Sequence, residues 1–186
     1  MPESSVFRLA GWGAFAGVVL MVLFFVALAA APTSGVSEVL AVVGVGALTP
    51  AFYGLYRAHR HESVGWSRLG LVAWVPAAAL DIASLLSPGN IGLFALDNLV
   101  FAVPFLVFGG LALRSAPMPR ALGWVALVTG AAYLLAGVAT VAGSQVGGMI
   151  GGLGGLVFML IWFAWLSRLF LTGRFAGLQE GSVSRR

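Results

Sequence analysis

The chain contains no cysteine and no lysine. Without cysteine there is no disulfide, no thiolate nucleophile and no metal site with a cysteine ligand. Without lysine the chain cannot form a Schiff base with retinal or pyridoxal phosphate, and it cannot supply the lysine of a phosphate-binding P-loop. The two absences therefore exclude several classes of cofactor-dependent enzyme.

Charged residues are also scarce, because they make up 9% of the 186 residues whereas 60% are hydrophobic. Soluble domains usually carry about 25% charged residues. A surface with so little charge suits lipid rather than water, so we expect a membrane protein. The length allows one membrane domain, residues 1–186, and leaves no room for a second folded unit.

The two histidines of the chain, His59 and His61, fall in a segment that we expect to be a solvated polar loop. Their position outside the apolar runs argues against a haem held by two histidines within the membrane. Side chains two residues apart point in different directions on a helix, so His59, His61 and Glu62 do not predict a metal site. We expect neither a cofactor nor a metal ion.

Six apolar runs dominate the chain, and each reaches or approaches the length of about 20 residues that a helix needs to cross a bilayer. None shows the two-residue alternation of a membrane strand, and in lipid a helix satisfies its backbone hydrogen bonds within one segment. The first run resembles a signal peptide but is longer than a usual signal core, so we expect it to be retained. The sequence therefore predicts an all-α membrane protein with six transmembrane helices, arranged as three helical hairpins with short loops. The predicted spans are residues 8–31, 36–56, 66–86, 91–113, 121–142 and 146–171.

All ten basic residues are arginine, and they lie at or beyond alternate ends of the predicted spans. The loops 57–68 and 114–120 contain arginine, whereas the loops 32–37, 87–90 and 143–145 contain no basic residue. The positive-inside rule therefore predicts a multi-pass protein of the plasma membrane with both termini in the cytoplasm. Arginines at helix ends also contact lipid headgroups. No basic face with interleaved aromatic residues indicates a nucleic-acid partner.

A weak internal repeat supports the three hairpins. Residues 8–12 read Arg-Leu-Ala-Gly-Trp and residues 120–124 read Arg-Ala-Leu-Gly-Trp, with a looser copy at residues 68–70. The pattern is typical of repeated hairpins in parallel arrangement. It is equally explained by the need for an arginine anchor and a tryptophan at each cytoplasmic helix end.

Two carboxylates, Asp81 and Asp97, lie inside the third and fourth predicted spans. An ionisable side chain within a span is costly, so it marks a functional site by default. Each lies six residues from the outer end of its helix, which places both about 9 Å below that end. Glu38 begins the second span on the same side. We therefore expect the acidic side chains to gather in the outer half, with no arginine near them.

Three arrangements are open for the pair, because two unpaired carboxylates at that depth cannot both stay ionised cheaply. Asp81 and Asp97 hold a proton and hydrogen-bond to Asn98, Tyr53 or Tyr133, or they face water in an outward vestibule, or they bind a cation or a cationic ligand. A purely structural pair, protonated or solvated, is the competing interpretation. The residues Asp97 and Asn98 also have the composition of a cap on a broken helix.

Prolines and glycines predict how the spans pack. Pro50, Pro76 and Pro104 lie within three neighbouring spans, and we expect kinks there that open a small cavity around the acidic pair. Glycines repeat at four-residue spacing in the sixth span and let another backbone approach closely. They serve packing within the bundle or the seam of a homodimer. The helix-packing glycines are Gly147, Gly151 and Gly155, and Gly13 and Gly17 repeat the pattern in the first span.

No catalytic constellation is present, so we predict that the protein is not an enzyme. The serines near the predicted outer side have no histidine within reach for a Ser-His-Asp arrangement. No metal-binding Asp-x-x-x-Asp motif accompanies the two aspartates. The aromatic group Phe158, Trp162, Phe163 and Trp165 lies near the inner end of the sixth span. We expect it to belong to the interfacial aromatic belt.

Residues 68–72, 120–134 and 155–165 resemble segments of small bacterial six-helix membrane proteins of unknown function. The chain is also similar in size, charge and helix number to the substrate-binding S-components of energy-coupling-factor vitamin transporters. In that family an Ala-x-x-x-Ala pair on the first helix docks the transport subunit, and Ala10 and Ala14 have this spacing. The long outer loop that gates the vitamin site in those proteins has no counterpart in this sequence.

Two functions are consistent with these patterns. The first is an integral membrane protein that binds or transports a small ligand, with a cation as one option, in a pocket of the outer half. The second is a non-catalytic accessory or assembly subunit that packs on a partner membrane subunit, or on a second copy, through its glycine-rich face or a lipid-facing side. Membrane lipid is a partner in both. The predicted ligand-binding residues are Glu38, Tyr53, Asp81, Asp97, Asn98 and Tyr133.

Overall fold

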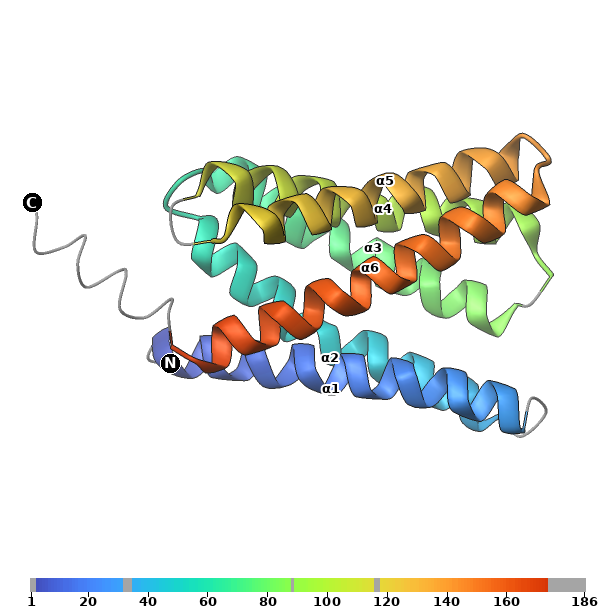
Figure 1. Cartoon of the computed structure of the whole chain (residues 1–186), viewed down its shortest axis with the longest axis horizontal. Helices are drawn as coiled ribbons and strands as arrows, with labels where there is room; N and C mark the ends of the chain where they lie inside the picture. Colours follow the sequence, from blue (N-terminus) through green and yellow to red (C-terminus); the bar gives the residue numbers. More distant parts are fainter. Residues whose placement is uncertain (1–2, 32–34, 88, 116–117, 174–186) are drawn as a thin grey trace, which may run out of the picture.

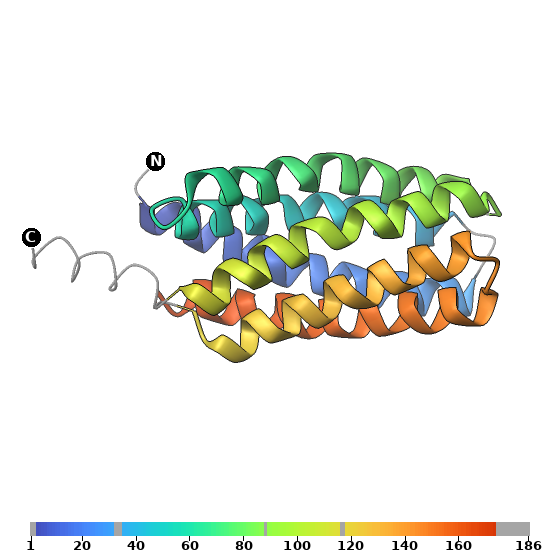
Figure 2. The same cartoon turned by 90° about the horizontal axis from the view of Figure 1, so that it is seen from above.

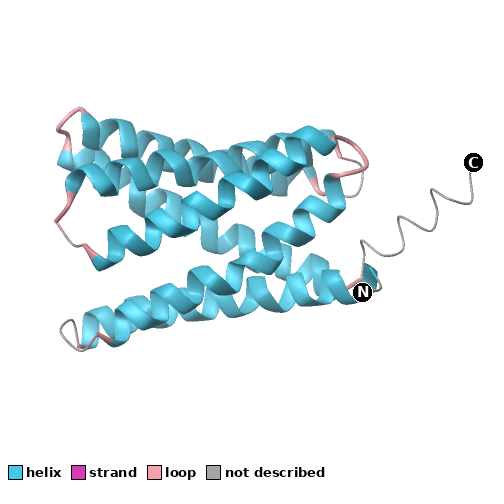
Figure 3. Ribbon diagram, turned by 180° about the vertical axis from the view of Figure 1, so that it is seen from behind, coloured by secondary structure: helices cyan, strands magenta, loops and turns pink. Residues whose placement is uncertain are grey.

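The computed structural model describes residues 3–31, 35–87, 89–115 and 118–173, which form helices and short connections and contain no strand (Figure 3). All six helices are long and apolar enough to cross a membrane, which confirms the predicted all-α, six-helix architecture. Their ends agree closely with the predicted spans, except that α1 begins at Glu3 and α2 continues to His59. The helices are α1 (Glu3–Ala30), α2 (Val36–His59), α3 (Val64–Leu86), α4 (Ile91–Arg114), α5 (Arg120–Val141) and α6 (Gln145–Leu171).

The helices form a ring in which each packs on the next in sequence, and α6 closes the ring against α1. The alternating chain direction places the beginning of α1 and the end of α6 at the same end of the bundle (Figures 1 and 2). The described arginines also lie at this end, which we call the arginine end. They are Arg8, Arg57, Arg60, Arg68, Arg114, Arg120 and Arg168. The opposite end, which holds the starts of α2, α4 and α6, is called the acidic end because Glu38 lies there.

Side chains cap the starts of α4 and α6 at the acidic end. Asn90 caps α4 by accepting a hydrogen bond from the backbone amide of Leu93 at 3.0 Å. Ser144 caps α6 by accepting from the amide of Gly147 at 3.2 Å. Both side chains satisfy a backbone donor that has no partner within the helix. Gly143 precedes Ser144 with a φ of 77°, a conformation that glycine adopts without strain.

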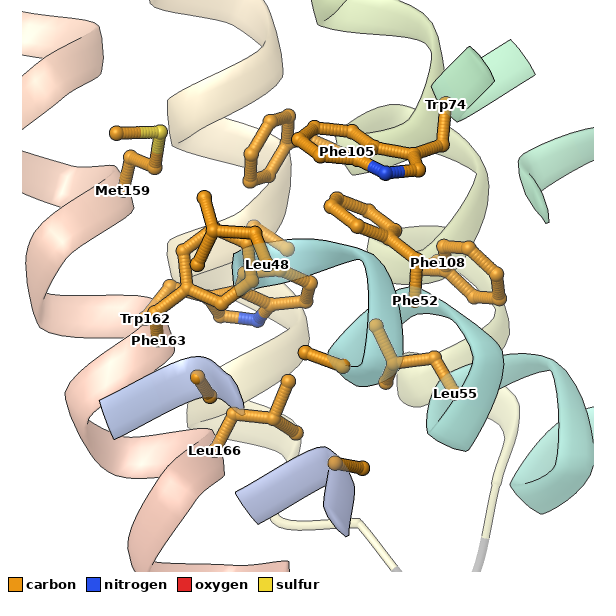
Figure 4. Close-up of a cluster of buried hydrophobic side chains, with 14 of the residues drawn as sticks. Leu48, Phe52, Leu55, Trp74, Phe105, Phe108, Met159, Trp162, Phe163 and Leu166 are labelled. Carbon is orange, nitrogen blue, oxygen red and sulfur yellow. The ribbon is translucent and has the colours of Figure 1, made fainter. Parts of the chain in front are cut away.

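A cluster of aromatic side chains fills the bundle around Phe52 of α2 (Figure 4). Its ring stacks on Trp74 of α3 with centroids 4.1 Å apart, and it lies 5.7 Å from Phe163 of α6. Trp162 and Phe163 are buried within this cluster. Their prediction as part of an interfacial belt was therefore wrong. The six helices are apolar on all sides, so the sequence lacks the contrast that separates a buried face from a lipid-facing one.

Three other tryptophans have the exposure expected of a belt. Trp12, Trp66 and Trp124 lie in the first halves of α1, α3 and α5, and each is more than half exposed. All three are at the arginine end. Their amphipathic rings suit the level of the lipid headgroups beside the arginine anchors.

The glycines of α6 pack within the chain. A Cβ atom at Gly151 would lie 2.6 Å from the backbone nitrogen of Ala136 in α5. A Cβ atom at Gly147 would meet Ala139, and one at Gly155 would meet the ring of Tyr133 at 3.1 Å. Helix α5 therefore covers the glycine face, as the prediction of packing within the bundle required. A homodimer seam on the same face is not compatible with this arrangement.

Helix α2 extends one turn further than predicted and buries His59. The side chain is 0% exposed, and its ring lies 6.2 Å from that of Phe108. Phe52, Leu55 and His59 follow helical spacing along one buried face of α2, which explains why the helix continues into the segment that we had predicted as a loop. The prediction of a solvated loop was wrong for His59. His61 lies in the exposed turn that follows.

Candidate functional site

A cavity of about 650 Å³ lies at the acidic end, and all six helices contribute to its wall. Its polar side chains include Glu38 of α2, Asp81 of α3 and Asp97 of α4. Apolar walls come from Phe24 of α1 and Phe94 of α4. The volume falls within the range of about 300–1,000 Å³ that is usual for small-molecule sites.

A second cavity of about 350 Å³ lies deeper in the bundle and shares Asp81 and Asp97 with the first. Its further walls include Phe101, Tyr133 and Met159. The two aspartates therefore stand at the junction between a wide outer chamber and a narrower apolar one. The predicted convergence of Asp81 and Asp97 at matching depth agrees with this geometry.

Asp97 has the environment that most needs an explanation. Its side chain is 7% exposed, and its Oδ1 atom has no hydrogen-bond partner among the described residues. Burial of an unpartnered polar atom costs free energy, and the cost is larger for a carboxylate. Asp81 is half-buried and lines the same two cavities. Of the described residues that line them, none is basic, so no arginine neutralises the pair.

Glu38 lies in the first turn of α2, where the partial positive charge of the helix N-terminus favours a carboxylate. The buried Ser37 hydroxyl donates a hydrogen bond of 2.9 Å to its Oε2 atom. This contact orients the carboxylate toward a defined position on the wall of the larger cavity. Glu38 therefore lies on the same cavity wall as Asp81 and Asp97.

Asn98 and Tyr133 line the smaller cavity, but their hydrogen bonds do not go to the aspartates. The Asn98 amide donates to the carbonyl of Phe94 one turn earlier, at 2.7 Å. The Tyr133 hydroxyl donates to the sulfur of Met159 at 3.6 Å. Helix α4 is continuous through this region, so the alternative of a broken helix capped by Asp97 and Asn98 was wrong.

Tyr53 is not brought to the site. It is 40% exposed, its ring lies 6.1 Å from that of Tyr56, and it is absent from the described walls of both cavities. It follows Glu38 by fifteen residues, which is about 22 Å along the helix toward the arginine end. Its neighbour Phe52 takes the buried face, so Tyr53 points outward.

The sequence reasoning missed several side chains of the cavity wall. Ser84 lies three residues after Asp81, and Phe94 lies three residues before Asp97. That spacing puts each on the same helix face as the neighbouring aspartate, so it was a usable signal. Thr140 near the end of α5 also lines the larger cavity, and no spacing connects it with the acidic pair.

The prolines lie in the interior of their helices, as the sequence requires. Pro50, Pro76 and Pro104 are within α2, α3 and α4, and each helix continues beyond its proline.

Next to Pro50, the indole nitrogen of Trp74 donates to the hydroxyl of Thr49 at 3.1 Å. This bond joins α3 to α2 near the middle of the bundle.

The arrangement can bind a cation or a cationic group, because its carboxylates are acceptors that face an apolar chamber. In the described part of the chain, no three carboxylate or imidazole side chains lie close enough together to hold a metal ion. An extended ligand, rather than a point charge, matches the distribution of Glu38, Asp81 and Asp97. Comparison with protein-family models, curated proteins and solved structures found no match to this chain, so the geometry of the cavity carries the functional argument.

Proposed function

We propose that the chain is an integral membrane protein that binds or transports a small cationic ligand in the cavity at the acidic end. One observation carries this proposal: Asp97 lines a cavity that has room for a ligand, and its buried Oδ1 atom has no hydrogen-bond partner among the described residues. A buried acceptor without a partner is stabilised when a ligand donates to it. The absence of basic residues from the described walls favours a positive group over a negative one.

The acidic end lies on the outer side of the plasma membrane in this proposal, with the arginine end in the cytoplasm. The support is the positive-inside rule applied to the arginine positions. Because the chain has no cysteine, single substitutions can report the orientation. In intact cells a membrane-impermeant thiol reagent should label a Gln145→Cys variant. It should reach a His61→Cys variant only after permeabilisation, and the opposite pattern would reverse the orientation.

Native mass spectrometry of the purified full chain tests the ligand directly. We expect a small molecule to be retained by the original protein and lost from Asp97→Asn, which keeps the shape of the side chain but removes its charge. Thr129→Val is the matched control, because Thr129 is fully buried and lines neither cavity. It should retain the ligand. Equal retention by all three proteins, or retention by none, contradicts the proposal.

The alternative function, a non-catalytic accessory or assembly subunit, needs either the face formed by Gly147, Gly151 and Gly155 or a lipid-facing side of the bundle. Helix α5 covers the glycine face within the chain. A partner subunit would therefore have to pack on a lipid-facing surface instead. For this reason the ligand-binding function is the better supported of the two.

A further inference from the structure

We propose that the ligand is an amphiphilic amine, and that it reaches the acidic cavity sideways from the bilayer through a gap between α1 and α6. This inference rests on the proposed function and specifies the chemistry of its ligand. It follows from three features of the acidic half: a divergence of two helices, exposed apolar side chains on the cavity wall, and the separation of charge from apolar surface inside it.

Helices α1 and α6 are in contact near the arginine end and separate toward the acidic end. Near the arginine end Phe7 stacks on Phe170 with centroids 5.6 Å apart, and Gly11 lies against Leu171. Toward its start, α6 instead packs on α5 through Gly151. Figure 1 shows the two helices diverging along their length, and Figure 3 shows the same separation from behind.

The cavities reach the molecular surface in this gap. Phe25 of α1 and Leu153 of α6 line the smaller cavity, although they are 36% and 58% exposed. Met149 lines both cavities and is 65% exposed, and Leu28 lines the larger one at 41% exposure. Because these exposed cavity-lining side chains come from the two helices that diverge, we infer that the cavities open between α1 and α6. We call these four residues the portal.

Small residues keep the portal open on its α6 side. Gly148 lines both cavities, and Gly152 lines the smaller one. A Cβ atom at Gly152 would meet only Phe94, at 3.9 Å. The absence of side chains here leaves a path from the portal to the aspartates. Leu153 lies eight residues into α6, about 12 Å from its start, so the portal extends into the hydrocarbon region.

The interior suits a ligand with a positive head and an apolar body. The head group would bind Asp81 and Asp97, the carboxylates shared by both cavities. The body would contact Phe24 and Phe94, which line both cavities, and in the smaller cavity also Phe101. A lipid phosphate would find no basic partner on the described walls, which favours an amine without phosphate over a phospholipid. A hydrophobic amine also concentrates in the bilayer, from which the portal is accessible.

Equilibrium binding of radiolabelled dodecylammonium to the full chain in phosphatidylcholine nanodiscs tests the ligand chemistry, with empty nanodiscs as background. We expect saturable binding that Asp97→Asn weakens at least tenfold and that Thr129→Val leaves unchanged. Dodecanol has the same chain without the charge, and methylammonium has the charge without the chain. Neither should compete within a hundredfold of dodecylammonium. Competition by either one at similar concentration overturns the assignment of an amphiphilic amine.

Association rates measured by rapid filtration test the route. Leu153→Trp should narrow the portal and slow association at least fivefold, whereas Val157→Trp, one turn further along the exposed face and outside both cavities, should not. Gln145→Trp instead narrows the larger cavity at the end of the bundle, where the turn residues Asn90 and Gly143 line it. Slower association in Gln145→Trp than in Leu153→Trp, or equal rates in Leu153→Trp and Val157→Trp, contradicts access from the bilayer.

The proposed function and the proposed ligand chemistry can fail separately. If native mass spectrometry finds a ligand that depends on Asp97 but dodecylammonium does not bind, the proposed function stands and the amphiphilic amine is wrong. If neither experiment finds a ligand that depends on Asp97, both are wrong.

Discussion

The two halves of this bundle are built from the same six helices but are packed differently. At the arginine end and in the middle, large aromatic side chains such as Phe52 and Trp162 fill the interior. At the acidic end the interior holds carboxylates, glycines and two cavities. The difference arises because α6 crosses from α5 to α1, so the ring is tight where α6 meets α1 and open where it has left α1 (Figure 1). One half is therefore filled with side chains, and the other contains the cavities.

The largest effect should come from emptying the packed half. Phe52→Ala removes a fully buried ring in contact with several others, and we expect a loss of about 3–5 kcal/mol in the free energy of unfolding. Phe94→Ala also removes a phenyl ring, but this ring is on the cavity wall, is 41% exposed and already borders empty space. It should cost less than about 1 kcal/mol. Unfolding by SDS in mixed micelles measures both, and equal losses would show that the halves are packed alike.

A smaller loss is expected from separating α5 and α6. Gly151→Leu places a side chain against the backbone of Ala136, and overpacking of this kind costs about 1–3 kcal/mol. Gly154→Leu is the matched control on the same helix, because no atom lies within 4 Å of its Cβ position. The same SDS titration should separate the two variants. Similar stability for both would mean that α5 does not hold the glycine face in solution.

The smallest effect concerns the hydrogen bond between α2 and α3 in the middle of the bundle. Trp74→Phe removes the donor to Thr49, and we expect the bond itself to account for about 0.5–1.5 kcal/mol of the loss, apart from the packing that the smaller ring gives up. A double-mutant cycle with Thr49→Val isolates the bond from the change in packing. The loss in the double variant should be smaller than the sum of the single losses. Additive losses would show that the bond contributes nothing to the packed region.

The sequence was sufficient to predict the bounds of the helices and the depth at which Asp81 and Asp97 lie. Helix lengths follow from the thickness of the bilayer, and antiparallel neighbours with equal loop offsets bring Asp81 and Asp97 to one level. The rotation of each helix about its own axis, which decides which side is buried, was harder to predict. Tyr53 and Trp162 were assigned to the wrong surroundings because an apolar helix in lipid carries no polar face to show which side is buried.

The crossing of α6 from α5 to α1 also could not be predicted from the sequence. Four-residue glycine spacing predicted close packing for Gly147, Gly151 and Gly155, but it did not say which helix would cover them. The cavity exists because these glycines hold the start of α6 on α5 while Phe170 holds its end on α1. Its walls therefore depend on contacts between segments that are far apart in the chain.

Thiol labelling of a single cysteine in the cavity tests the central claim most directly, because the chain itself has no cysteine. Ser84 lines the acidic cavity, and Ser67 on the same helix is 0% exposed in the packed half. In Ser84→Cys we expect a trimethylammonium-ethyl methanethiosulfonate to react faster than its sulfonato-ethyl analogue, by at least tenfold after correction for their rates with a free thiol. Ser67→Cys should react with neither. An unreactive Ser84→Cys, or one that prefers the anionic reagent, would contradict an accessible, negatively charged cavity.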